Sequence, residues 1–186
     1  MRNFRSVSVI CSALQRILRI LHGRSVLTRV LDELDTALLT LVQQDARLTN
    51  KELAARLHVA QSTCLERIRR LTKRGILRGE HADVDLKQIG RGTQAMVAVQ
   101  LRPPDRAVIE SFQGFVANLP EVLSYFVMAG GDDFLLHVAV ADNDQLSAFI
   151  LDRLTQRREI VHVRTSVIFS HVRRTVVLPL EGAASS

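Results

Sequence analysis

The chain has 186 residues, a formal net charge of +6 and an isoelectric point near 10.3, and 47% of its residues are hydrophobic. This length accommodates one large or two small globular domains, and the basic balance favours polyanionic partners. The two cysteines, Cys11 and Cys64, have no metal-ligand spacing and exclude a disulfide framework, so they fit a protein of a reducing cytosol.

Residues 1–30 contain six arginines and no acidic side chain, as much net charge as the whole chain carries. Gln15, Arg16 and Arg19 interrupt the apolar run, so this basic extension is neither a convincing secretory signal nor long enough to span a membrane. Three interpretations stay open: an amphipathic helix for a partner or an anionic surface, a disordered arm that touches DNA nonspecifically, or an extension from a start codon chosen too early. The organised chain begins at about Val30.

Residues 31–80 predict three short helices with tight breaks between them. The first has leucines at helical spacing and ends near 45–46. The second opens with TNKE, in which Thr49 and Glu52 predict a capping box. The break HVAQ precedes the third helix, and we expect Val59 to fill the corner between the two helices. This arrangement predicts a helix-turn-helix unit.

The third predicted helix, within STCLERIRRLTKRGILR, has a strongly basic exposed face. Cys64, Ile68 and Leu71 form its buried stripe, which leaves five cations and one anion on the other sides. Hydroxyl groups near its start can reach base edges in a major groove, and arginines can bind phosphates or guanine. The exposed residues are Ser62, Thr63, Glu66, Arg67, Arg69, Arg70, Lys73 and Arg74.

The remaining sequence alternates between strand-like and helix-like segments. Strands are expected over 93–104, 121–130, 133–142 and 160–174, and helices over 105–119 and 143–157. GGD at 130–132 predicts a tight hairpin between the middle two strands. The order β-α-β-β-α-β is that of a ferredoxin-like domain, an antiparallel sheet with both helices on one face. Self-association is the simplest way to hide the other face, expected to be rich in valine and phenylalanine.

The predicted fold class is therefore α+β, with an N-terminal helix-turn-helix domain and a C-terminal ferredoxin-like domain. Gly90 and Gly92 mark the connection between them. The expected organisation is a basic extension at 1–30, the helix-turn-helix domain at 31–80, a linker at 81–92, the ferredoxin-like domain at 93–180 and a tail at 181–186.

In their order and spacing, residues 31 to about 180 resemble the Lrp/AsnC family of bacterial and archaeal transcription regulators. LDELDTALLTLVQQDAR is similar to the family's opening helix, ELAARLHVAQSTCLERIRRLTKRGIL to its helix-turn-helix, and AGGDDFLLHVAV to its ligand-responsive Gly-x-x-Asp-[Tyr/Phe]-Leu hairpin. The resemblance implies a DNA-binding domain, a short linking strand near 81–90, and a domain that forms homodimers and octamers and binds an amino acid between dimers. STCLERIRRL resembles actinobacterial members, some of which govern amino-acid catabolism such as alanine degradation.

The family's recognition helix corresponds to Gln61–Lys73 in this sequence. The resemblance then implies base contacts from Gln61, Ser62, Thr63, Glu66 and Arg67, and phosphate contacts from Arg69, Arg70, Lys73 and Arg74. Ala60 stands where the family usually has serine, so the usual N-cap is missing. A cap by Ser62, or a capping box of Thr63 with Glu66, would shift the start of the helix.

The GGDDF stretch has the two poles that a zwitterionic amino acid needs. Glycines free backbone N–H groups for a carboxylate and an aspartate can meet an ammonium group, although the same residues also simply make turns. The family's motif positions correspond to Gly130 and Asp133, and Asp132 stays open. The implied effector-binding residues are Gly130, Gly131, Asp132, Asp133, Phe134 and Thr165, the last of them across an interface.

These features imply a cytoplasmic, sequence-specific DNA-binding regulator that responds to a small amino acid and acts on its own gene and on amino-acid metabolism genes. No metal, cofactor or membrane is implied, and the sequence has no P-loop, Gly-x-Ser-x-Gly or His-Glu-x-x-His motif, so no enzyme is expected. The alternative is a ligand-sensing ferredoxin-like oligomer with nonspecific DNA or RNA binding. Against RNA, residues 31–80 contain no aromatic residue on which bases could stack.

Overall fold

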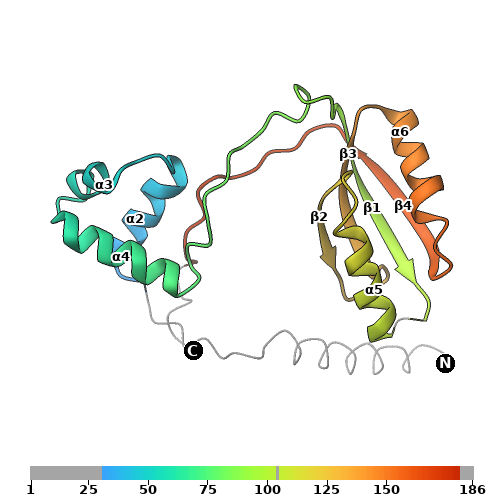
Figure 1. The fold of residues 1–186 in the computed structure, drawn as a ribbon, viewed down its shortest axis with the longest axis horizontal. Coiled ribbons are helices and arrows are strands. Elements are labelled where there is room, and N and C mark those ends of the chain that lie inside the picture. The colour runs from blue at the N-terminus through green and yellow to red at the C-terminus, as the bar shows by residue number, and fades with distance from the viewer. Residues whose placement is uncertain (1–30, 104, 181–186) are drawn as a thin grey trace. The chain divides into compact units, whose positions relative to one another are not determined.

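The computed structural model describes residues 31–103 and 105–180 (Figure 1). These residues form two compact units. The described residues up to Asp83, together with 172–180, form what we call the helical unit, and residues 84–171 form the sheet unit. None of the described helices is long and apolar enough to cross a membrane.

The helical unit contains α2, Glu33–Gln44, α3, Asn50–Arg56, and α4, Gln61–Lys73. The predicted capping box is confirmed, because the Thr49 hydroxyl accepts the Glu52 N–H while the Glu52 carboxylate accepts the Thr49 N–H. Cys64 and Leu71 of α4 are fully buried in the core, and Val59 packs against it as predicted. The buried core consists of Leu38, Leu39, Leu53, Ala54, Cys64 and Leu71.

The start of α4 lacks a side-chain cap. Ala60 occupies the N-cap position in extended backbone, with no capping hydrogen bond from its side chain. The missing cap is therefore confirmed, and α4 begins at Gln61. The alternative caps, by Ser62 or by Thr63 with Glu66, are wrong, because these residues already lie within the helix.

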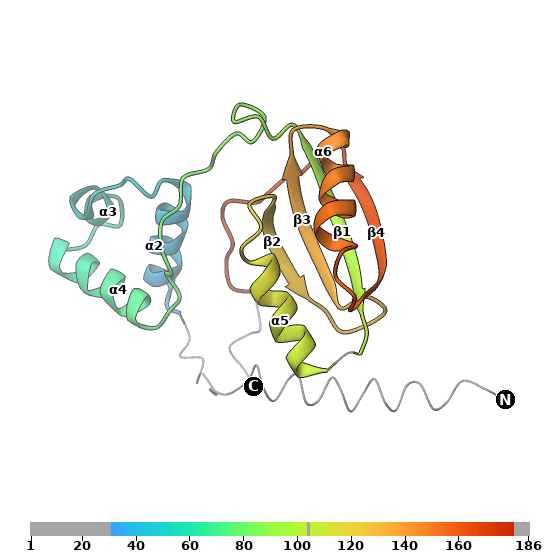
Figure 2. The same ribbon diagram turned by 45° about the vertical axis from the view of Figure 1, so that its right-hand side comes forward.

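The sheet unit has the predicted β-α-β-β-α-β order. Its elements are β1, Thr93–Leu101; α5, Arg106–Val116; β2, Val122–Val127; β3, Phe134–Val140; α6, Asn143–Ala148, continued by the π-helical turn η1, Phe149–Leu154; and β4, Ile160–Ile168. The strands are ordered β2-β3-β1-β4 and all neighbours are antiparallel. Helices α5 and α6 lie on the same face of the sheet (Figure 2), which confirms the predicted ferredoxin-like arrangement.

The core of the sheet unit lies between the sheet and its two helices. Side chains on one side of β1, including Val97 and Val99, are fully buried there. Phe112 of α5 packs edge-on against Phe134 of β3, with ring centroids 4.7 Å apart. Phe134 is fully buried, so its side chain belongs to this core and presents no surface to a ligand.

The outer face of the sheet differs from the prediction. The alternation of side chains turns Val97, Val99 and Val163 toward the helices, so a valine-rich outer face is wrong. A row across the outer face consists of Phe126, Leu135, Ala98 and Arg164. This face is therefore a mixture of apolar, polar and charged side chains.

Two connections also differ from the predictions. The hairpin between β2 and β3 has a loop over 128–133, longer than the tight turn expected. In the described chain, no strand forms over 81–90. The Asp85 carboxylate accepts the N–H groups of Lys87 and Gln88 at 2.9 and 3.4 Å, which favours a turn over the implied linking strand.

Candidate functional site

Helix α4 carries an exposed polar stripe along its length. Ser62, Glu66, Arg69 and Lys73 are all exposed, and their spacing of four, three and four residues places them on one side of the helix. Gln61 is also exposed. Of the other predicted DNA-contacting residues, Thr63 and Arg74 are half-buried. The stripe has the length and chemistry of a surface that enters a major groove.

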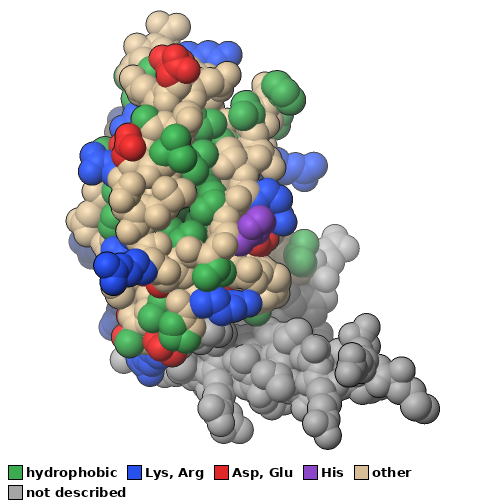
Figure 3. Space-filling model, turned by 90° about the vertical axis from the view of Figure 1, so that its right-hand side faces the viewer, with side chains coloured by type: hydrophobic (Ala, Val, Ile, Leu, Met, Phe, Trp, Pro, Cys, Tyr) green, Lys and Arg blue, Asp and Glu red, His purple; other side chains and the backbone are tan. Residues whose placement is uncertain are grey.

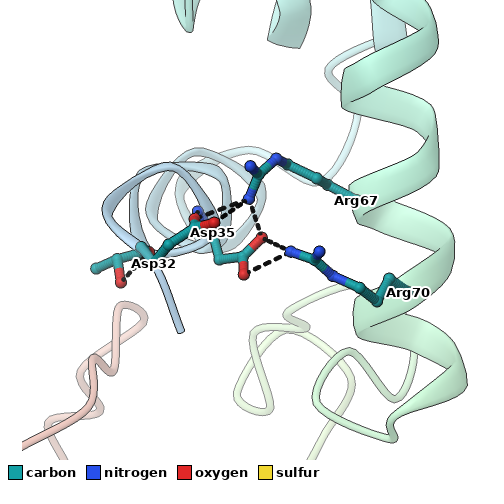
Figure 4. Close-up of polar contacts among 5 residues, drawn as sticks. Asp32, Asp35, Arg67 and Arg70 are labelled. Atoms are coloured by element: carbon teal, nitrogen blue, oxygen red, sulfur yellow. Dashed lines mark hydrogen bonds and ion pairs between the residues drawn. The ribbon is translucent and has the colours of Figure 1, made fainter. Parts of the chain in front are cut away.

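Arg67 and Arg70 instead extend toward α2, where they meet Asp32 and Asp35 (Figure 4). Arg67 Nη1 donates to both oxygens of Asp32, at 2.8 and 2.6 Å, and to Asp35 Oδ1 at 2.8 Å. Arg70 Nη2 donates to both oxygens of Asp35 at 2.8 Å. We call these four residues the α2–α4 ion cluster.

The buried member of the ion cluster is Asp35, whose side chain is 2% exposed. Asp32 is more exposed and also caps α2, because its Oδ1 accepts the Asp35 N–H at 2.7 Å. The hydrogen bond from Arg67, and then that from the Asp35 N–H, hold the pKa of Asp32 below its ordinary value. Hydrogen bonds to Asp32 and Asp35 in turn raise the pKa of Arg67. Asp32 and Arg67 therefore stabilise each other's charged forms.

Sequence reasoning missed the ion cluster. It assigned Arg67 to base contacts and Arg70 to phosphate contacts without a partner inside the protein. A signal was present in the sequence, because Asp35 lies three and four residues before Leu38 and Leu39, on the stripe that faces the core. A carboxylate on a buried stripe requires a cationic partner.

The predicted effector corner is the loop over 128–133. Asp133 ties this loop to β1 at both its backbone and its side chain. Its N–H donates to Val99 O at 3.0 Å, and its Oδ2 accepts the Leu101 N–H at 2.7 Å. Its carbonyl accepts the Met128 N–H at 2.8 Å, which closes the loop. One oxygen of the Asp133 carboxylate, Oδ2, is therefore already used to hold the loop.

The rest of the loop meets two residues that the sequence analysis did not assign. Asp132 Oδ2 accepts from Arg164 Nη2 of β4 at 2.6 Å, and Gly131 O accepts from Gln100 Nε2 of β1 at 2.9 Å. Gly130 has a φ of +156° and open space where a Cβ would lie. The corner thus contains a carboxylate, a guanidinium and an open glycine backbone, the groups that complement an ammonium and a carboxylate.

Thr165 does not join this corner within one chain. It pairs with Val97, whose side chain faces the helices, whereas its neighbour Arg164 projects from the opposite face to reach Asp132. A role for Thr165 across an interface stays a prediction.

Apolar side chains also gather on the side of the sheet unit where α6 and β4 lie (Figure 3). Leu151 of η1 and Val161 and Val167 of β4 are 45 to 56% exposed there. On the other edge strand, β2, Leu123, Phe126 and Val127 are exposed as well. Among the described residues, no group of histidine, cysteine and acidic side chains is arranged to hold a metal ion.

A helix-turn-helix unit with a basic third helix, linked to a sheet unit with a polar loop, defines a class of DNA-binding transcription regulators that carry a ligand-binding domain. Residues 31–72 match the AsnC-type helix-turn-helix domain, and residues 94–178 match the Lrp/AsnC ligand binding domain. The chain belongs to the Lrp/AsnC family.

Known relatives agree with this assignment. The chain is 39% identical to the transcriptional regulator AldR of Mycolicibacterium smegmatis over 150 residues. This match covers 81% of this chain and 88% of AldR. It is 32% identical over 152 residues to the regulator AzlB of Bacillus subtilis, covering 82% and 97% of the two chains. Because these relatives are named as transcriptional regulators, the chain is a regulator and not an enzyme. The mycobacterial match agrees with the resemblance of STCLERIRRL to actinobacterial members.

A solved structure shares the fold. A Neisseria meningitidis transcriptional regulator in complex with L-Met superposes with a TM-score of 0.74 at 34% identity, covering 82% of this chain and 98% of that one.

Proposed function

We propose that this protein binds specific DNA sequences through α4 and adjusts that binding in response to an amino acid held at the 128–133 loop. The observation that carries the proposal is the exposed stripe of α4, which combines the hydroxyl of Ser62 near its start with Arg69 and Lys73 further along. Hydroxyl groups read base edges, and the cations neutralise phosphates. Its targets are its own promoter and genes of amino-acid metabolism, and it acts in the cytoplasm.

The nature of the effector is inferred from the chemistry of the loop. An amino acid presents an ammonium and a carboxylate a short distance apart, and the loop offers Asp132 and Arg164 with the open backbone at Gly130. The L-Met bound to the related Neisseria protein supports an amino-acid ligand. Because Asp133 is bonded to Leu101, Asp132 is the better partner for the ammonium group.

Self-association supplies the link between effector and DNA in this proposal. Both edge strands expose apolar side chains, which supports a homodimer that assembles to an octamer. An amino acid bound between dimers shifts this assembly only through its difference in affinity for the alternative states. A changed assembly alters the spacing of the α4 helices that meet successive major-groove segments.

DNA binding to the protein's own upstream region tests the proposal. Affinity is measured at one fixed salt concentration, with and without each common amino acid, beside a fragment of shuffled sequence. We expect preference for the upstream fragment, a change with at least one amino acid, and loss of affinity in Arg69→Ala. Equal affinity for both fragments and indifference to every amino acid would overturn the proposal in favour of a generic basic surface.

A further inference from the structure

The arginines of α4 have different surroundings although they follow one another closely in the sequence. Arg69 is exposed on the stripe that also carries Ser62, Glu66 and Lys73. At roughly 100° per residue, Arg67 lies well away from this stripe, on the side that faces α2. Its side chain is 22% exposed, and its Nη1 is shared between Asp32 and Asp35.

We infer that Asp35 is a positioning residue for DNA recognition, which holds Arg67 as a strut between α2 and α4 and so aims the stripe of Ser62, Glu66, Arg69 and Lys73 at the DNA. Arg67 is then a structural residue rather than a DNA contact. The inference rests on the proposed DNA-binding function and assigns the roles of individual residues within it.

The geometry of the cluster is suited to setting an angle between helices. Asp35 is the buried carboxylate at the centre, and it accepts from arginines one turn apart on α4. Hydrogen bonds to two points along one helix oppose both its rotation and its sliding, whereas apolar packing tolerates small shifts. A buried ion pair contributes little net stability compared with apolar side chains, so its value here lies in specifying one arrangement.

The missing cap of α4 gives this positioning more weight. The side chain of Ala60 provides no hydrogen bond to the first turn, which is the part of the helix where Gln61 and Ser62 are proposed to meet the bases. The Asn50 side chain holds that turn by donating to Gln61 O at 3.0 Å, and the ion cluster adds polar contacts further along α4. Arg70 is pinned at one nitrogen only and its side chain is 48% exposed, so its other N–H groups remain accessible for a phosphate.

The salt dependence of DNA affinity separates a strut from a phosphate contact, and the Asp35→Asn variant and arginine labelling described below separate a strut from a base contact. Each lost phosphate contact lowers the slope of log affinity against log salt by about one. We expect Arg69→Gln to lower the slope by about one on any DNA. Arg67→Gln, the matched change two residues earlier, leaves the slope unchanged. It reduces preference for the upstream fragment by roughly tenfold or more, because the misplaced stripe loses at least one specific base contact.

Asp35→Asn provides the second arm of the experiment. If Asp35 positions α4, Asp35→Asn reduces selectivity as Arg67→Gln does, and the double variant is no worse than either single one, because all of them break the same link. If Arg67 is instead a DNA ligand that Asp35 withholds, Asp35→Asn strengthens binding and Arg67→Gln lowers the slope. That outcome overturns the inference.

Arginine modification of the wild-type chain keeps the test independent of how the variants fold. Phenylglyoxal labelling, mapped by peptide mass spectrometry, is expected to be slow at Arg67 with or without DNA, while DNA protects a reactive Arg69. Rapid labelling of Arg67 that DNA suppresses would refute the assignment. If the proposed function itself is wrong, the wild-type protein shows no preference for its upstream fragment, a result distinct from those above.

Discussion

The Asp133 carboxylate accepts a hydrogen bond of 2.7 Å from the backbone N–H of Leu101, which joins the 128–133 loop to the end of β1. Leu101 is fully buried, so this N–H has no access to water when its partner is lost. Asp132, by contrast, forms an ion pair with Arg164, whose side chain is 62% exposed. The two adjacent aspartates of GGDDF thus have different roles.

Asp133→Ala is therefore expected to lower the free energy of unfolding by about 1–3 kcal/mol, the cost of a buried donor left without a partner. Asp132→Ala removes an exposed ion pair and is expected to change stability by less than about 1 kcal/mol, but to abolish the response to the effector. Urea unfolding, combined with DNA binding in the presence of amino acids, separates the two variants. Equal destabilisation by both changes would contradict this division of roles.

Ala60→Ser supplies the cap that α4 lacks. Ala60 already has the extended backbone of an N-cap residue, with φ −65° and ψ 146°. The serine hydroxyl can therefore accept an N–H of the first turn and raise the unfolding free energy by about 1 kcal/mol. Thermal unfolding measures the gain, and Ala60→Val, which supplies no hydroxyl and caps as poorly as alanine, is the control. A melting temperature of Ala60→Ser that does not rise above that of the wild type would contradict the predicted gain.

His137 makes stability depend on pH. Burial, and then the nearby His171, hold its pKa below the ordinary value of 6.5, and its Nε2 lies 2.9 Å from Gln94 Oε1. Below pH 6.5 the unfolded chain binds a proton at His137 more readily than the folded chain does, so stability falls as the pH decreases through this value.

The free energy of unfolding is thus expected to be smaller at about pH 5.5 than at about pH 7.5, and His137→Gln is expected to reduce this difference. Urea unfolding at both pH values provides the measurement. His162→Gln, on the exposed part of β4, is the control and should keep the wild-type difference. A His137→Gln variant with the full wild-type difference would show that another group is responsible.

Gln43 binds the backbone of the C-terminal segment within the helical unit. Its Nε2 donates to Val177 O at 3.1 Å, and its Oε1 accepts the Val177 N–H at 2.9 Å. Gln43→Ala removes both exposed bonds, at roughly 0.5 kcal/mol each, and should speed tryptic cleavage after Arg174 by about fivefold. Gln44→Ala, the exposed neighbour, is the control. Equal cleavage rates in the two variants would mean that Gln43 does not hold the segment.

The sequence by itself determined the order and type of the elements, because these depend on local patterns. The capping box of Thr49 and Glu52 and the buried stripe of Cys64 and Leu71 involve residues at most one or two helical turns apart. The family motifs likewise predicted the boundaries of α4, Gln61–Lys73.

The tertiary structure decided which side chains meet. Asp35 and Arg67 are 32 residues apart in the sequence, as are Leu101 and Asp133. No periodic pattern in the sequence indicates either pairing. The strand register likewise turned the valines of β1 toward the helices and left a mixed outer face. Such contacts depend on how whole elements pack, so the sequence identified the arginines of α4, and only packing against α2 distinguished Arg67 from Arg69.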